Sequence, residues 1–121
     1  NDVSIIWHGK KIHITKIISL EDMVALVRTV LTCCVDSINQ TLRFEIVDFA
    51  LRSEIIERYS NTILPDDSSQ RYFIVYASGL YDEICKHINS DQIRAIHLSI
   101  TNYICPNIYP KSFITQGDID D

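Results

Sequence analysis

The chain has 121 residues, 46% of them hydrophobic and 22% charged, with a net charge of −5 and a pI near 5.2. A domain of this size buries enough surface to fold without disulfides or metals, and three glycines and three prolines exclude a disordered or collagen-like chain. The acidic balance argues against a nucleic-acid ligand, which needs a basic surface. No run approaches the roughly 18–20 apolar residues of a membrane span. No N-terminal segment resembles a signal peptide, so we expect one soluble, intracellular domain.

Four cysteines are present, and their positions favour free thiols. They are Cys33, Cys34, Cys85 and Cys105. Cys33 and Cys34 are neighbours in a helical pattern, so their side chains point in different directions. Without a secretion signal, we expect buried free thiols in a reducing compartment rather than disulfides.

The N-terminal residues 3–17 predict a β-hairpin. The runs 3–8 and 11–17 are β-prone, and Gly9-Lys10 lies between them. Two such runs around a glycine-containing turn are typical of a hairpin. A lone hairpin is marginal in water, so we expect it to pack on helices or to pair with another strand, including one from a partner chain.

Strand alternation predicts which face of the hairpin is buried. Ile12 and Ile14 are two residues apart and should share the buried face. On the first strand, the candidates for the positions opposite Ile12 and Ile14 are Ile5 or Ile6, and Trp7.

A first helix is predicted from Ser19 to about residues 37–40. Ser19 can cap the helix, and Asp22 lies where its side chain can reach back to the cap. The apolar stripe that follows has three- and four-residue steps, and its members are Leu20, Met23, Val24, Val27, Leu31, Cys34, Val35 and Ile38.

A second helix is predicted from Thr41 to Tyr59. Its apolar residues cover two neighbouring faces, so we expect it to be central and contacted on two sides. Asp48 with Arg52, and Glu54 with Arg58, are acid-first pairs four residues apart on its exposed face. Residues 61–69 read as a surface loop.

The next segment, 70–78, is ambiguous between strand and helix. Its aromatic and β-branched residues have strand propensity, but we favour a helix because another helical segment, 80–88, begins directly after Gly79. A last helix is predicted over 91–104, capped by Asn89 or Ser90 and ended by Cys105-Pro106.

These elements predict an α+β fold in which the hairpin packs on a bundle of about four to five helices. Residues 1–121 are read as a single domain, with hairpin 3–17, helical region 19–105 and an extended C-terminal tail over 106–121. No internal repeat or interdomain linker interrupts them.

The chain carries no recognisable catalytic or metal-binding motif. His8 and His13 flank the hairpin turn, and Cys85 and His87 are two apart on a helix, so they point away from each other. His97 lies on an apolar helical stripe, where a packed histidine is more common than a catalytic base. No zinc knuckle, nucleophile elbow or glycine-rich phosphate loop is present. We therefore expect a protein that is not an enzyme and uses no cofactor or metal.

Aromatic side chains are the best candidates for contacts with another protein. Large aromatic residues dominate such contacts when they are exposed. Trp7 beside the turn, Lys10 within it, and Tyr103, Tyr109 and Phe113 toward the C-terminus are the candidate interaction residues. Packing onto the helices is the competing interpretation for each aromatic ring.

Four short segments resemble a group of small bacteriophage-encoded proteins. They are Ile6–Ile12, which holds a W-x-G-K hairpin, and Leu20–Asp22, Tyr59–Ile63 and Ser78–Tyr81. The sequence departs from that pattern at His8, where the resemblance leads us to expect Asn. The resemblance implies a phage origin, a role in virion structure or assembly, and a location in the host cytoplasm or the virion.

Two functional hypotheses follow. In the first, the chain is a non-enzymatic phage protein that acts through contacts with copies of itself or with another virion protein. In the alternative, it is a phage-encoded inhibitor that binds a host defence protein, since acidic character suits a blocker of a basic channel. Neither hypothesis involves nucleic acid or a membrane as the partner.

Overall fold

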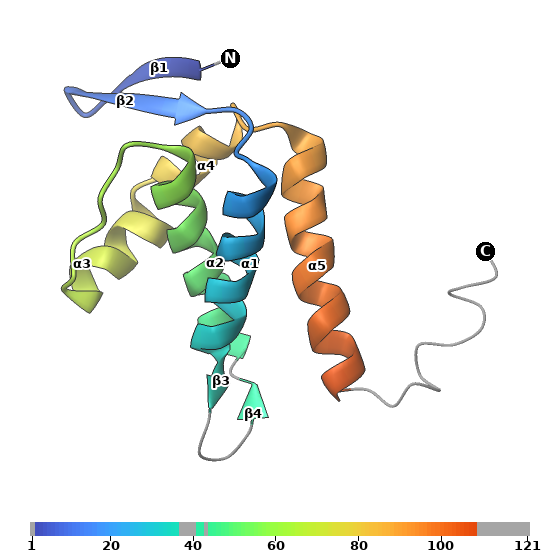
Figure 1. Cartoon of the computed structure of the whole chain (residues 1–121). Coiled ribbons are helices and arrows are strands. Elements are labelled where there is room, and N and C mark those ends of the chain that lie inside the picture. Colours follow the sequence, from blue (N-terminus) through green and yellow to red (C-terminus); the bar gives the residue numbers. More distant parts are fainter. Residues whose placement is uncertain (1, 37–40, 43, 109–121) are drawn as a thin grey trace.

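The structure, a computed structural model, describes residues 2–36, 41–42 and 44–108 (Figure 1). Its N-terminal antiparallel hairpin and following helices confirm the predicted α+β fold. In chain order the elements are β1 (Asp2–Trp7), β2 (Lys10–Thr15), α1 (Leu20–Cys34), β3 (Val35–Asp36), β4 (Thr41–Leu42), α2 (Phe44–Tyr59), α3 (Ser68–Tyr72), the π-helix η1 (Phe73–Ala77), α4 (Leu80–Cys85) and α5 (Ser90–Ile108).

The hairpin closes through a two-residue turn, His8–Gly9, and Trp7 lies opposite Lys10. Both turn residues have positive φ, 49° at His8 and 80° at Gly9. Positive φ at both central residues is the geometry of a type I′ turn, whose twist matches that of the flanking strands. The turn therefore lies one residue earlier than the predicted Gly9-Lys10.

The hairpin lies across one end of the helices and buries one face against them (Figure 1). Ile12 and Ile14 are buried, as predicted. Ile5 and Trp7 pack against the core, whereas Ile6 is 71% exposed. This settles which of the two isoleucines faces inward.

Helix α1 begins at Leu20, where the Ser19 Oγ accepts a hydrogen bond from the Asp22 N–H at 3.1 Å. This confirms the predicted cap. The predicted continuation of the helix through residues 35–36 is wrong, because β3 and β4 form a short antiparallel pair after Cys34. The rest of the predicted continuation, 37–40, lies outside the described residues. The pair begins with the β-branched residues Val35 and Thr41, which favour extended backbone. Helix α2 consequently begins at Phe44 rather than at Thr41.

Residues 70–77 are helical rather than extended, as favoured. The Asp67 side chain caps α3 by accepting a hydrogen bond from the Gln70 N–H at 2.9 Å. The chain then widens into the π-helix η1, where the Ser78 N–H donates to the Phe73 carbonyl five residues earlier, at 3.0 Å. Gly79, with φ of 82°, separates η1 from α4.

Helix α5 continues to Ile108, so the predicted end at Cys105-Pro106 and the start of an extended tail at residue 106 are wrong. A proline within a helix lacks the backbone N–H, its ring crowds the carbonyl four residues earlier, and it disfavours helical angles at the residue before it. Pro106 lies in the last turn of α5, and the helix ends two residues later. The rest of the tail, 109–121, lies outside the described residues. Within the described ranges, the helices are too short or too polar to cross a membrane.

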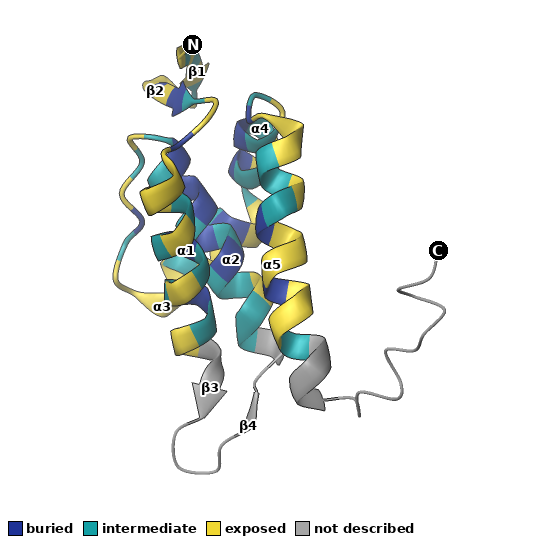
Figure 2. Cartoon of the chain, turned by 45° about the vertical axis from the view of Figure 1, so that its right-hand side comes forward, coloured by how far each residue is buried: buried dark blue, intermediate teal, exposed yellow. Residues whose placement is uncertain are grey.

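The core runs along the inward faces of the helices and the hairpin (Figure 2). Helix α2 contacts α1, α4 and η1, which confirms its predicted central place. The buried apolar side chains are Ile12, Ile14, Ile18, Leu26, Val30, Leu51, Ile55, Ile56, Tyr59, Leu64, Val75, Leu80, Ile84, Ile88, Ile96 and Ile100.

Two of the four thiols lie in the part of the chain whose side chains are described. Cys33 and Cys85 are both free. Cys85 is half-buried, but Cys33 is exposed, which corrects the expectation of buried thiols. Cys33 lies near the C-terminal end of α1.

Candidate functional site

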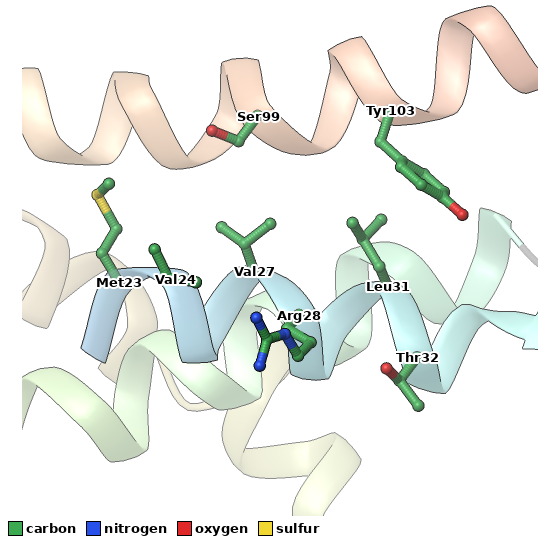
Figure 3. A pocket seen from close by; sticks show the side chains of 8 residues that line it. All are labelled: Met23, Val24, Val27, Arg28, Leu31, Thr32, Ser99 and Tyr103. Carbon is green, nitrogen blue, oxygen red and sulfur yellow. The ribbon is translucent and has the colours of Figure 1, made fainter. Parts of the chain in front are cut away.

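An apolar groove lies between α1 and α5 (Figure 3). Its volume is about 660 Å³. Its lining residues are Met23, Val24, Val27, Arg28, Leu31, Thr32, Ser99 and Tyr103. Six of these lie on α1 and two on α5, so the groove runs along the line where the two helices face each other.

Helix α1 supplies one side of the groove through two rows of side chains at four-residue steps. Met23, Val27 and Leu31 form the inner row, which is half-buried and packs against the core. Residues four apart share a helix face, and the outer row is Leu20, Val24, Arg28 and Thr32. In the outer row, Leu20 is 70% exposed and Val24 is 43% exposed. Helix α1 therefore has more apolar surface than the core covers.

Helix α5 supplies the opposite side through Ser99 and Tyr103. The Ser99 hydroxyl donates to the Ala95 carbonyl at 2.9 Å, so it is satisfied within its own helix. The Tyr103 ring projects from α5 toward the α1 side of the groove (Figure 3) and is 45% exposed. The wall is therefore mostly apolar, with polar groups that do not need a ligand.

Arg28 is the one charged side chain among the residues that line the groove. It is exposed, and within the described part of the chain its guanidinium forms no ion pair or hydrogen bond. The other described arginines, by contrast, all form ion pairs; they are Arg52, Arg58, Arg71 and Arg94. The groove thus combines an apolar floor with a single unpaired positive charge at its rim.

The candidate interaction residues fall in different places. Tyr103 lines the groove, and Lys10 is exposed beside the hairpin turn. Trp7 is half-buried and packs against the core, with its ring close to Gly79 and edge-on to His8 at 4.8 Å between ring centres. Tyr109 and Phe113 lie outside the described residues.

Sequence reasoning did not identify the α1 side of the groove. The predicted stripe placed both rows of α1 in one core-facing surface. A signal was present, because apolar residues at 20, 23, 24, 27 and 31 cover a wider arc than one neighbouring helix can bury. Arg28, which interrupts the outer row, marked where that arc meets solvent.

A second exposed aromatic group joins α2 to η1 and α4. The Arg52 guanidinium lies over the rings of Tyr76 and Tyr81, at 4.9 and 4.6 Å from their centres. Asp48 accepts hydrogen bonds from Arg52 Nε at 2.9 Å and from the Tyr76 hydroxyl at 2.7 Å. Burial and the bond to Asp48 raise the pKa of Tyr76 to about 12. The polar atoms of this group satisfy one another, so we interpret it as a structural link between helices.

The described residues bring together no group of three or more histidine, cysteine or acidic side chains that could hold a metal ion. His97 is exposed on α5. Among the described residues, His87 Nε2 lies 3.8 Å from Glu83 Oε2, at the surface of α4 and the turn after it.

Comparison with known proteins does not assign the chain to a family. No protein-family model, no curated protein and no solved structure matches the chain.

Proposed function

We propose that this chain is a non-enzymatic phage protein that works through protein–protein contacts in the structure or assembly of the virus particle. The groove between α1 and α5 carries the proposal, since an exposed apolar surface with a polar rim is typical of a protein-binding site. The resemblance to small phage proteins supplies the context. The chain would meet its partner in the host cytoplasm and remain with it in the particle.

We further propose that the groove takes an amphipathic helix of a virion protein. A helix presents apolar side chains at i, i+3 or i+4 and i+7 to such a groove. These span about 10 Å, close to the roughly 12 Å from Met23 to Leu31 along α1. The unpaired Arg28 adds charge complementarity, because it favours an acidic residue beside the apolar stripe of the partner helix.

A photo-crosslinking experiment tests this proposal. The chain would carry a benzophenone side chain in place of Val24 and be irradiated in cells that assemble the particle, and the crosslinked peptides would be sequenced. We expect them to come from one virion protein, with apolar residues at helical spacing and an acidic neighbour. A synthetic peptide of that segment then provides the ligand for binding measurements.

Charge reversal at Arg28 tests the predicted contact with the acidic residue of the peptide, and the same change at Arg94 is the matched control. Arg28→Glu should weaken peptide binding about fivefold to tenfold, and Val24→Asp should weaken it more than tenfold because it places a charge in the apolar floor. Arg94→Glu makes the same charge change on an exposed α5 position outside the groove and should leave binding unchanged. A basic residue in place of the peptide's acidic residue should restore binding to Arg28→Glu. Equal binding by the Arg28 and Arg94 variants would overturn the proposal.

A further inference from the structure

The two edges of the hairpin differ in their surroundings. Residues 60–61, which follow α2, pair with the outer edge of β2. Ile14 forms an isolated β-bridge with Ser60. The His13 N–H donates to Asn61 Oδ1 at 3.0 Å, and the Asn61 N–H donates to the His13 carbonyl at 3.2 Å. The segment after α2 therefore covers the edge of β2.

The outer edge of β1 has no such cover. Within the described residues, β1 forms backbone hydrogen bonds with β2 alone. A two-residue turn makes its flanking pair, Trp7 and Lys10, a hydrogen-bonded pair, and such pairs recur at every second residue. The N–H and C=O groups of Asp2, Ser4 and Ile6 therefore point outward. By the same alternation, the backbone N–H and C=O of His13, which lies opposite Ser4, point outward from β2. Asn61 forms hydrogen bonds with both of them.

Strand β1 also lacks the features that normally prevent edge pairing. Proline, lysine and bulges within an edge strand block the approach of another strand. The sequence of β1 is Asp-Val-Ser-Ile-Ile-Trp, with one charge, at its first residue, and the ladder with β2 runs without a bulge. Its outward face carries Ile6, which is 71% exposed. The edge is thus open, regular and partly apolar.

We propose that β1 pairs with β1 of a second copy of this chain, antiparallel and about a two-fold axis at Ser4. This register places Ser4 opposite the second Ser4, Asp2 opposite Ile6, and Val3 opposite Ile5. All three outward-pointing residues of each β1 then form hydrogen-bonded pairs, about six bonds in total. The half-buried side chains Val3 and Ile5 stay on the face that meets the helices.

Charge favours a second copy as the occupant. Because Ile6 lies beside Lys11 within each hairpin, the register puts Asp2 of one copy in the same row as Lys11 of the other. The two Asp2 carboxylates lie at opposite ends of the paired strands, so like charges are kept apart. The result is a four-stranded sheet, which is more stable than two isolated hairpins.

Solution mass and disulfide trapping test this pairing. Light scattering across a concentration series should show the full chain moving from one to two chain masses as its concentration rises. In a background with the four native cysteines replaced by alanine, Ser4→Cys should form a covalent dimer with oxidised glutathione, because facing residues of a hydrogen-bonded pair lie about 5.5 Å apart. Ile6→Cys is the matched control. It faces Asp2 rather than itself, so its dimer should form at least tenfold more slowly.

Proline at position 4 distinguishes edge pairing from other contacts. Ser4→Pro removes an outward N–H and leaves the ladder with β2 intact, so we expect a folded monomer by circular dichroism. Ser4→Ala, which also loses the Ser4–His13 side-chain bond at 2.9 Å, should still dimerise. A wild-type chain that stays monomeric, equal trapping of the two cysteine variants, or a Ser4→Pro dimer would each overturn the proposal. The pairing is independent of the groove, and Val24→Asp should leave it unchanged.

Discussion

The Gln92 side-chain amide forms hydrogen bonds with the backbone of the segment between the hairpin and α1. Its side-chain Oε1 accepts hydrogen bonds from the Ile18 N–H at 2.9 Å and from the Tyr59 hydroxyl at 2.5 Å. Its Nε2 donates to the Ile18 carbonyl at 2.9 Å. One amide thus satisfies both backbone groups of Ile18 and the hydroxyl of a fully buried tyrosine. It joins the segment between β2 and α1 to α2 and α5 at a single point.

We predict that Gln92→Ala lowers the free energy of unfolding by about 2–3 kcal/mol, because it leaves buried polar groups without partners. Gln92→Glu should also be destabilising, since a carboxylate can still accept from Ile18 and Tyr59 but places a second acceptor oxygen against the Ile18 carbonyl. Urea denaturation of each variant measures the effect. Gln70→Ala, on the exposed surface of α3, is the control and should change stability by under about 0.5 kcal/mol. Equal losses at both glutamines would contradict the assigned role.

Local side-chain pairs could be predicted from sequence, but their long-range partners could not. The spacing of Asp48 and Arg52 predicted their ion pair, and it forms at 2.9 Å. That Tyr76 and Tyr81 enclose the same arginine depends on how η1 and α4 pack on α2. No periodicity within α2 contains this information. The same holds for Gln92, which in sequence is a polar residue in a helix's first turn.

At the scale of elements, the hairpin turn carries a residue that fits it poorly. Type I′ turns favour Asn followed by Gly, because Asn tolerates positive φ better than other residues with a side chain. Position 8 holds His, with φ of 49°. We predict that His8→Asn stabilises the chain by about 0.5 kcal/mol, measured as a rise in thermal midpoint. His97→Asn, at an exposed site in α5, should give no rise because Asn is a poorer helix former. A lower midpoint for His8→Asn would show that its ring contact with Trp7 matters more than the backbone.

Hydrophobic periodicity predicted which elements exist, and failed at their boundaries. The steps of three and four residues located α1, α2 and α5. In α1, however, the buried residues are Leu26 and Val30, which the predicted stripe did not include. The β3–β4 pair was not predicted, because strands of two residues are too short to show an alternation of polar and apolar side chains. The π-helix was not predicted because a hydrogen bond to the fifth residue back leaves no separate pattern in the side chains. Both sides of the groove were predicted as helices, but how far apart they lie follows from packing alone.

For the whole molecule, the hairpin lies across one end of the helices (Figure 1), whereas the groove lies between α1 and α5. Asn61 fixes β2 from the end of α2, and Gln92 fixes the following segment from the start of α5. The hairpin that carries the open edge of β1 is therefore tied to two helices. If both proposed contacts form, the molecule pairs with its own copy through β1 and holds a partner helix in the groove, as a connecting component of an assembly would.

Tyrosines with raised pKa values make the stability of the chain depend on pH in the alkaline range. Burial, followed by the nearby Cys85 thiolate, raises the pKa of Tyr59 to about 12. Burial raises the pKa of Tyr81 as well, and that of Tyr76 reaches about 12 through burial and its bond to Asp48. In the unfolded chain these hydroxyls titrate near 10. Between pH 10 and 12 the folded state therefore binds more protons than the unfolded state.

A raised pKa contributes stability that is complete below pH 10 and is lost as pH rises toward the folded value. We expect the free energy of unfolding to fall above pH 10, with Tyr59 alone contributing a slope of up to about 1.4 kcal/mol per pH unit near pH 11. Urea denaturation across that range measures the slope, and tyrosinate absorbance reports the ionisation. Tyr59→Phe should be less stable at neutral pH, because it loses the bond to Gln92, and should show a shallower alkaline slope. An unchanged slope in this variant would mean that Tyr59 ionises in the folded chain as it does in water.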